Sequence, residues 1–369
     1  MNLYYPKTKS LFSEYLVEIR LGSTLTISAV LLLFILFTFQ SYSFSQQSKE
    51  LFYVGTFSGQ PDEGVNVYEF DRANSKLKLI QSVFDRVNPS YLELNPNGNY
   101  LYTVNRQGLS ESSNEGSVSV FKINQLNGTL RLMKTVGSKG ISPCHVSVDP
   151  KGRFLTISHY MSSHLSIFKI KKNGNVGKLI EQIKLKGSGP NLPRQAESHL
   201  HSAIINKTGT ALYASDLGAN RIYQIDIKEI RSKLRFTVSD TIFTSPGSGP
   251  RHLTISPNSN YAFSIEELSS SVSMYSIDLT SLNLQLLDRK LMIDSASNDS
   301  IMNTASDLVT SQDGEFLYAS NRGFDNVVVY KIDQSADSLI QMRSVSSRGK
   351  KAKRNLYGSV RIFFDCCQS

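Results

Sequence analysis

The chain has 369 residues, of which 40% are hydrophobic, and a formal net charge of +9. This length permits one large domain or two ordinary ones. The basic residues are spread along the chain apart from a run at Arg348–Arg354, so the charge weakly favours anionic ligands and predicts no nucleic-acid partner. Three cysteines, Cys144, Cys366 and Cys367, are too few for a disulfide framework, and their spacing predicts no metal site.

The chain begins with an apolar segment. Leu21–Phe39 contains no charged residue and follows several basic ones, a pattern typical of a signal peptide or a membrane-spanning helix. Ser43-Phe44-Ser45 has the small residues of a cleavage site, which favours removal near Ser45 over a retained anchor. We therefore expect residues 1–45 to be a signal peptide or N-terminal membrane anchor. The remainder should then be periplasmic or secreted, in contact with the membrane only through this segment if it is not cleaved.

A repeated unit follows, consisting of a short alternating strand, a tight turn and a second strand rich in aromatic and small residues. It occurs five times, as PSYLELNPNGNYLYTVN (Pro89–Asn105), PCHVSVDPKGRFLTISH (Pro143–His159), SHLHSAIINKTGTALYASD (Ser198–Asp216), PRHLTISPNSNYAFSIEE (Pro250–Glu267) and ASDLVTSQDGEFLYASN (Ala305–Asn321). Four turns place glycine where a hairpin requires a positive φ, and Ser259 replaces it once. The repeat therefore predicts five similar hairpins.

Each hairpin is followed by a third strand, such as NRIYQIDI (Asn220–Ile227), and by a fourth. Four antiparallel strands recurring about every 50 residues are typical of a β-propeller blade. A β-sandwich is the alternative, but it gives no reason for so regular a repeat. The first unit starts at Leu51–Phe57 with what resembles the second strand of a blade, so its first strand should come from elsewhere, as propellers commonly take it from the C-terminus.

The pattern changes near the C-terminus. Lys353–Val360 resembles the opening strand of a seventh blade, and RIFFDCCQS then ends the sequence. We expect an all-β, seven-bladed propeller of four-stranded antiparallel blades over residues 46–355, with its last blade incomplete through a frameshift or truncation, and a divergent tail over residues 356–369. The expected consequence is an open ring.

Several motifs together resemble one family. YVGTF, the PNGNYLYTVN hairpin, GSGPNLPRQAESHLHS, ASDLGANRIY, GSGPRHLTIS, EELSSSV and YASNRG occur in this order. The set resembles the lactonase family of seven-bladed propellers, which includes 6-phosphogluconolactonases and carboxymuconate-lactonizing enzymes. The resemblance covers Leu51 to about Asn355 and implies hydrolysis of a small anionic, sugar-type lactone in carbohydrate metabolism. A carboxymuconate-type cyclase and a non-catalytic propeller that binds ligands or proteins are the alternatives.

The resemblance also implies a site at one end of the central channel. Its histidine falls on His201, its glutamate on Glu267 and its arginines on Arg251 and Arg322. His199 is the neighbour of His201, and in a strand the two side chains would share a face, which makes His199 a further candidate for substrate binding.

Lactone hydrolysis requires water activation, oxyanion stabilisation and protonation of the leaving alkoxide. His201 or Glu267 can act as the general base. Arg251 and Arg322 can bind an anionic group and stabilise the oxyanion. This scheme needs no metal and no cofactor. If the enzyme hypothesis is right, these four side chains should converge in one pocket.

Other polar residues are expected to have structural roles. Arg194 and Asp216 should tie a long loop to its blade, and no function is assigned to His145, His159 or His164. Two departures from the family pattern stand out. Glu266 replaces the asparagine that usually precedes the glutamate, although adjacent strand residues point to opposite faces. Asp307 and Val309 stand where the family often has a glutamate and a histidine.

Overall fold

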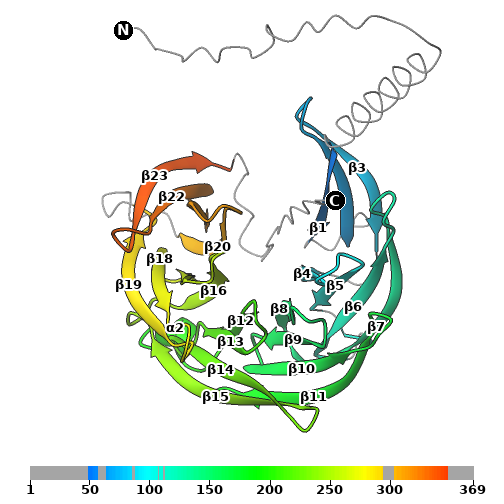
Figure 1. Ribbon diagram of the computed structural model, residues 1–369, viewed down its shortest axis with the longest axis horizontal. Coiled ribbons are helices and arrows are strands. Elements are labelled where there is room, and N and C mark those ends of the chain that lie inside the picture. Colours follow the sequence, from blue (N-terminus) through cyan, green and yellow to red (C-terminus); the bar gives the residue numbers. More distant parts are fainter. Residues whose placement is uncertain are drawn as a thin grey trace, which may run out of the picture.

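The described residues of the computed structural model, 49–56, 64–84, 88–106, 108–110, 113–293 and 303–347, form six antiparallel sheets arranged around a common centre (Figure 1). The expected all-β propeller is confirmed. Residues 1–48 and 348–369 lie outside the described residues, and with them the predicted signal segment and the opening strand of a seventh blade. Among the described residues no helix is long and apolar enough to cross a membrane.

We number the sheets as blades in chain order. Blade one contains β1 (Lys49–Gly55), β2 (Val65–Asp71) and β3 (Lys76–Val83). Blade two contains β4 (Pro89–Leu94), β5 (Tyr100–Asn105), β6 (Glu115–Ile123) and β7 (Leu130–Ile141). Blade three contains β8 (Pro143–Val148), β9 (Phe154–His159), β10 (His164–Ile170) and β11 (Val176–Lys184).

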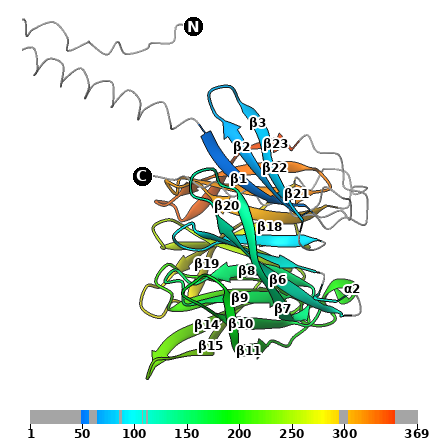
Figure 2. The same ribbon diagram turned by 90° about the vertical axis from the view of Figure 1, so that its right-hand side faces the viewer.

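Blade four contains β12 (Leu200–Ile205), β13 (Ala211–Asp216), β14 (Arg221–Ile230) and β15 (Lys233–Phe243). Blade five contains β16 (Pro250–Ile255), β17 (Tyr261–Glu266), β18 (Ser271–Ile277) and β19 (Leu284–Leu291). Blade six contains β20 (Thr304–Thr310), β21 (Phe316–Arg322), β22 (Asn326–Asp333) and β23 (Ser338–Ser346). A short helix, α2 (Leu192–Gln195), precedes blade four and lies at one flat face of the ring (Figure 2).

The strands follow the predicted repeat. Blade one has three described strands, as expected from its first unit, whereas each of the other five has four. The hairpin turns also agree, since Gly98, Gly152, Gly209 and Gly314 have φ between 66° and 73°. Ser259 adopts φ 63° at the equivalent place, a conformation in which its Cβ is crowded.

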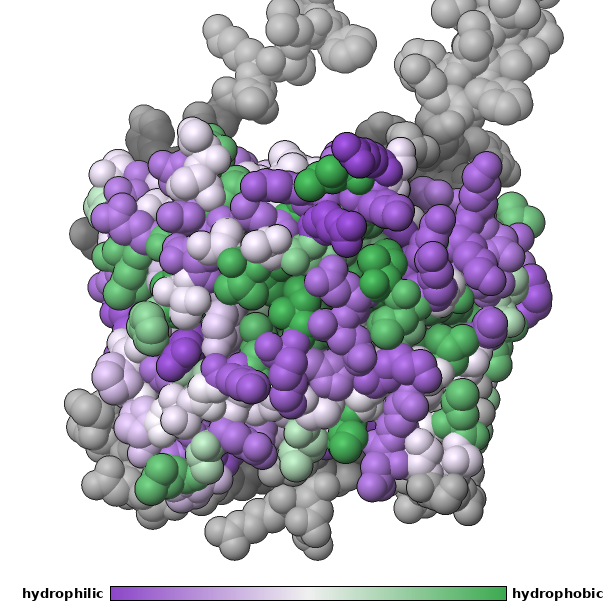
Figure 3. Space-filling model, turned by 90° about the horizontal axis from the view of Figure 1, so that it is seen from below, coloured by the Kyte–Doolittle hydropathy of each residue, from purple (hydrophilic) through white to green (hydrophobic). Residues whose placement is uncertain are grey.

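The hydrophobic core lies between neighbouring blades. Between blades three and four, for example, Phe154 and Leu165 of one sheet pack against Leu200, Leu212 and Tyr223 of the other. Burying each such side chain contributes about 1.5–3 kcal/mol. The fourth strands lie on the outside, and Figure 3 shows apolar side chains among hydrophilic ones on the outer surface near β11 and β15. The first strands therefore face the centre, with their backbones fixed by packing on both sides.

Candidate active site

In blades two to five, an extra residue in the inner strand carries a side chain that lines the cavity. In blade two, Pro89 pairs with Asn105 and Tyr91 with Val104, which leaves Ser90 as the extra residue of a β-bulge. The same shift in blades three, four and five leaves Cys144, His201 and Arg251. Bulges re-aim side chains and are frequent beside active sites. All four of these residues line one cavity.

A second repeat position also contributes to the cavity lining. The residue at or just after the end of each second strand lines the cavity in four blades, as Arg106, Tyr160, Glu267 and Arg322. In blade four this position is Leu217, which is fully buried. Blades two, three and five thus contribute a residue from each of two adjacent strand ends, and blades four and six contribute one each.

The residue immediately before this second position braces the blade instead. Glu266 is fully buried and accepts hydrogen bonds from Ser271, Ser273 and Arg289 at 2.5–2.8 Å. Asp216 accepts from the backbone N–H groups of His199 and Ala219, each at 2.8 Å, so its predicted structural role is confirmed. The expectation that Glu266 and Glu267 point apart is also confirmed, because they have separate sets of partners.

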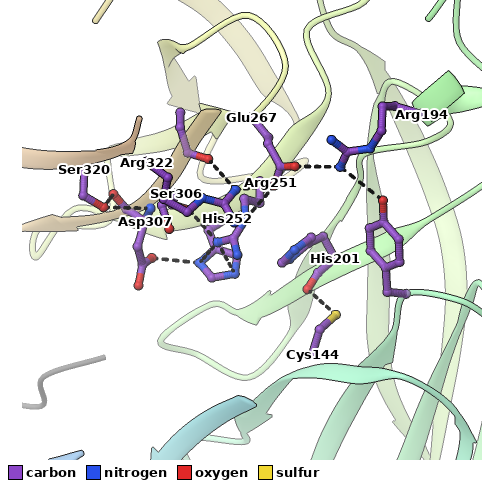
Figure 4. A network of polar contacts seen from close by, with 12 residues as sticks. Cys144, Arg194, His201, Arg251, His252, Glu267, Ser306, Asp307, Ser320 and Arg322 are labelled. Atoms are coloured by element: carbon purple, nitrogen blue, oxygen red, sulfur yellow. Dashed lines mark hydrogen bonds and ion pairs between the residues drawn. The ribbon is translucent and has the colours of Figure 1, made fainter. Parts of the chain in front are cut away.

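The cavity encloses about 250 Å³. Its lining includes all four residues that the resemblance placed at the family's site, which are His201, Arg251, Glu267 and Arg322. They come from blades four, five and six, and Figure 4 shows them turned toward one another. The predicted convergence in one pocket is therefore confirmed.

Glu267 joins three arginines. Its Oε2 lies 2.9 Å from Arg251 Nε and 2.8 Å from Arg322 Nη2, and its Oε1 lies 2.7 Å from Arg194 Nη2. Burial would raise the pKa of this carboxyl group, but Arg322, Arg251 and Arg194 outweigh it and lower the pKa to about 2. Glu267 is therefore a permanent anion at neutral pH and a weak proton acceptor.

The cavity carries an excess of positive charge. Among the described residues, Arg106, Arg194, Arg251 and Arg322 line it, with Glu267 as the one acidic residue in the lining. Four positive charges and one negative charge give a balance of +3 with histidine uncharged. Because water is partly excluded, these charges are screened less than surface charges. The lining is suited to an anionic ligand.

His201 is held in the uncharged form. The side chain is 8% exposed, and burial together with the positive charge of Arg251 holds its pKa well below the ordinary value of 6.5. Its Nδ1 is buried and has no hydrogen-bond partner among the described residues. A neutral imidazole at the cavity wall can accept a proton from a bound water molecule.

His199 differs from His201 in its surroundings. It precedes β12, which begins at Leu200, and the bulge at His201 breaks the strand alternation, so the two histidines are not an i, i+2 pair of one regular strand, although both rings contact Tyr160. The His199 ring stacks on Tyr160 with centroids 4.4 Å apart, whereas His201 meets Tyr160 edge-on at 5.7 Å. His199 is not among the residues lining the cavity.

Arg194 is part of the cavity wall, which corrects the purely structural role predicted for it. Its Nη2 contacts both Glu267 and the hydroxyl of Tyr160, the latter at 3.4 Å. The following residue, Gln195, fixes the loop by donating to Leu217 O at 2.8 Å and Asn220 Oδ1 at 3.1 Å. The loop therefore holds Arg194 over the pocket.

Other cavity residues were not predicted. Cys144 contacts the carbonyl oxygen of His201 at 3.1 Å, and burial, as the largest cause, raises the pKa of its thiol to about 12. Arg106 and Tyr160 occupy the same repeat position as Glu267 and Arg322. Aligning the hairpins position by position would have identified both.

Three aromatic rings form a buried layer beside the cavity. The ring centroids of Tyr91 and His145 are 4.0 Å apart, and His252 lies 5.6 Å from each. His201 is 5.1 Å from His252. His145, to which the sequence assigned no role, thus packs within the histidine cluster, and burial holds its pKa well below 6.5.

The comparisons with known proteins agree with this arrangement. The model of the family described as lactonase, 7-bladed beta-propeller, matches residues 51–356. A 6-phosphogluconolactonase of Formosa agariphila is 33% identical over 78% of this chain and 80% of its own length. One of Bacillus subtilis is 28% identical over 82% of this chain and 83% of its own. The structure of a periplasmic gluconolactonase of Pseudomonas aeruginosa superimposes with a TM-score of 0.75 at 26% identity, covering 82% of this chain and 85% of that one.

Proposed function

Since the chain belongs to the lactonase family of seven-bladed β-propellers, we propose that it hydrolyses a sugar-type lactone, and that the lactone carries an anionic group. The observation that carries the proposal is the convergence of His201, Arg251, Glu267 and Arg322 on one cavity. The names of the relatives, 6-phosphogluconolactonase and gluconolactonase, support the substrate class. The surplus positive charge of the lining supports the anionic group.

His201 is the proposed general base. Its neutral imidazole accepts a proton from water as the water oxygen forms a bond to the lactone carbonyl carbon. The ring C–O bond then breaks, and the imidazolium returns the proton to the leaving alkoxide. The neighbouring arginines that lower the pKa of His201 make its protonated form a strong acid, which favours this second transfer. The carboxylate oxygens of Glu267 are held by Arg194, Arg251 and Arg322, which makes it less suited to accept the proton.

Arg251 and Arg322 are the proposed oxyanion-stabilising groups. Both are held by Glu267 before substrate arrives, so little reorganisation accompanies the appearance of negative charge on the carbonyl oxygen. Arg322 Nε is buried and has no partner among the described residues, which leaves a donor for a ligand. Glu267 thus acts by fixing the arginines. His199 does not line the cavity, so its proposed contribution to substrate binding is indirect: it stacks on Tyr160, which does line it.

Turnover of glucono-1,5-lactone and its 6-phosphate, followed in a pH-stat, tests the proposal. We expect hydrolysis above the buffer rate by the wild type and a loss of at least 100-fold in kcat for His201→Gln. His164→Gln, the same substitution outside the cavity, should retain activity. Absence of turnover on both lactones by a folded wild-type protein would contradict the proposal and favour a propeller that binds ligands without catalysis.

We also propose that the protein is located outside the cytoplasm. Residues 1–45 would be a signal peptide or anchor, residues 46–355 the catalytic domain and residues 356–369 a tail. This assignment is supported by the uncharged apolar run Leu21–Phe39 and by the similarity to a periplasmic gluconolactonase. Fractionation of cells that express the complete chain tests this assignment. Recovery of the protein in the cytoplasmic fraction, with its N-terminus intact, would contradict it.

A further inference from the structure

A line of polar contacts leads from blade six to the cavity. Asp307 Oδ1 lies 2.8 Å from His252 Nδ1. Arg251 Nη1 lies 3.2 Å from His252 Nε2 and 3.4 Å from Nδ1. Arg251 Nε lies 2.9 Å from Glu267 Oε2. Neither Asp307 nor His252 lines the cavity, and the polar contacts of the pair lead to it through Arg251 (Figure 4).

The partners of His252 determine which ring nitrogen carries the proton. Asp307 is a carboxylate, because its contacts with His252 and Arg251 outweigh burial and lower its pKa, and a carboxylate can only accept. His252 Nδ1 must therefore be the donor. The ring itself is neutral, since burial and Arg251 lower the pKa of His252. Arg251 Nη1 lies at nearly the same distance from both ring nitrogens, so it rests against the face of this neutral ring.

Arg251 depends on such contacts for its direction. Its side chain is 4% exposed, and Nη1 also donates to the carbonyl oxygen of Ser306 at 2.6 Å. If the contact between His252 Nδ1 and Asp307 were lost, the ring of His252 could turn and the guanidinium that rests on it would be displaced. A positive group displaced by about 1 Å from the developing oxyanion costs a large part of its contribution to the rate.

We propose that Asp307 and His252 are positioning residues for the lactonase reaction: Asp307 accepts from Nδ1–H and so fixes the ring of His252, and the face of that ring supports the guanidinium of Arg251. The pair also joins blade five to blade six, because His252 lies on β16 and Asp307 on β20. The Asp307 carboxylate acts through His252 and then Arg251, and it needs no contact with the substrate.

The kinetic test rests on the proposed function and compares substitutions of Asp307. Asp307→Ala should lower kcat by about 10-fold or more with little change in KM, since an outer partner orients a group used in the transition state. Asp307→Asn should restore most of kcat, because its amide oxygen still accepts from Nδ1–H. Val309→Ala, a change on the same strand at a side chain that is 56% exposed, is the matched control. Equal rates for Asp307→Ala and Val309→Ala, or no recovery in Asp307→Asn, would overturn the proposal.

A double-mutant cycle separates positioning from general damage. His252→Phe keeps a ring within the aromatic layer but removes the donor to Asp307 that fixes the ring, and should lower kcat as Asp307→Ala does. Adding Asp307→Ala to His252→Phe should then have no further effect, because the two residues act in series. Independent, additive losses in the two variants would contradict a relay.

A spectroscopic measurement is independent of turnover. In protein with ¹³C- and ¹⁵N-labelled histidine, the His252 signals, assigned by their absence in His252→Phe, should report the Nδ1–H tautomer in the wild type and in Asp307→Asn. Asp307→Ala should lose this preference. An Nε2–H tautomer in the wild type would overturn the positioning role even if the lactone is hydrolysed. Conversely, the Nδ1–H tautomer in a protein without turnover would contradict the proposed function alone.

Discussion

Arg194 Nη2 lies 2.7 Å from Glu267 Oε1, although Arg194 belongs to the loop before blade four and Glu267 follows the second strand of blade five. The contact closes one side of a cavity that otherwise consists of strand ends. Replacing Arg194 with glutamine should weaken binding of an anionic lactone and raise KM about 10-fold or more, because a charged donor is lost. Steady-state kinetics of this variant measure the effect, with the exposed Arg235→Gln as control. An unchanged KM would mean that Arg194 does not contact the substrate.

Glu267→Gln should destabilise the fold as well as the reaction. The substitution removes the one negative charge shared by Arg194, Arg251 and Arg322 and leaves three guanidinium groups without their buried partner. Removing one member of a buried ion pair costs about 3–5 kcal/mol, and urea unfolding should show a loss of this order. The exposed Glu315→Gln is the matched control. A variant as stable as the wild type would show that the arginines do not need this carboxylate.

Acid should reduce stability before it protonates Glu267. The folded-state pKa values of His145, His201 and His252 are lowered, largely by burial, and that of His159 is about 3. Below pH 6.5 the unfolded chain binds protons that these four side chains cannot, so the free energy of unfolding falls as the pH decreases. Glu93 has the opposite effect. Burial raises its pKa to about 8, so between pH 4.5 and 8 the folded chain binds one proton that the unfolded chain does not.

Just below pH 6 the unfolded chain therefore binds up to about three more protons than the folded chain, and the free energy of unfolding falls by about 4 kcal/mol for each pH unit of acidification. Urea unfolding at pH 7, 6 and 5 measures it. His145→Phe should reduce the slope by about one proton, and an unchanged slope in this variant would show that His145 titrates normally in the fold.

Cys144 should resist alkylation in the folded protein. Its side chain is 5% exposed, and its raised pKa of about 12 keeps the thiol protonated at pH 8, whereas the thiolate is the reactive form. Iodoacetamide treatment followed by mass spectrometry of the peptide that contains Cys144 tests this. Modification should appear only in urea, and rapid labelling under native conditions would contradict the assignment of a protonated thiol.

The sequence predicted the fold well because the repeat is local. Each hairpin has its own alternation and its own turn glycine, and the three-stranded first blade follows from the phase of Leu51–Phe57. The convergence of His201, Arg251, Glu267 and Arg322 was also predicted, but from family motifs rather than from geometry.

The remaining features depend on tertiary structure. Strand alternation placed His199 beside His201, and the bulge at His201 invalidates that rule. Arg194 was assigned a structural role because nothing in a loop sequence shows where a long side chain reaches. The pairing of His252 with Asp307 joins residues 55 positions apart, so only the contact of neighbouring inner strands brings it about.

The separation of bracing and cavity positions at the second-strand ends has an evolutionary consequence. Asn105, His159, Asp216, Glu266 and Asn321 maintain the individual blades, whereas the next residue lines the cavity in four of the five. Selection can therefore exchange a cavity residue while the bracing side chain and the backbone ladder of that blade stay in place. The same scaffold can diversify toward new lactones one blade at a time, except at Glu267, which ties Arg194, Arg251 and Arg322 together.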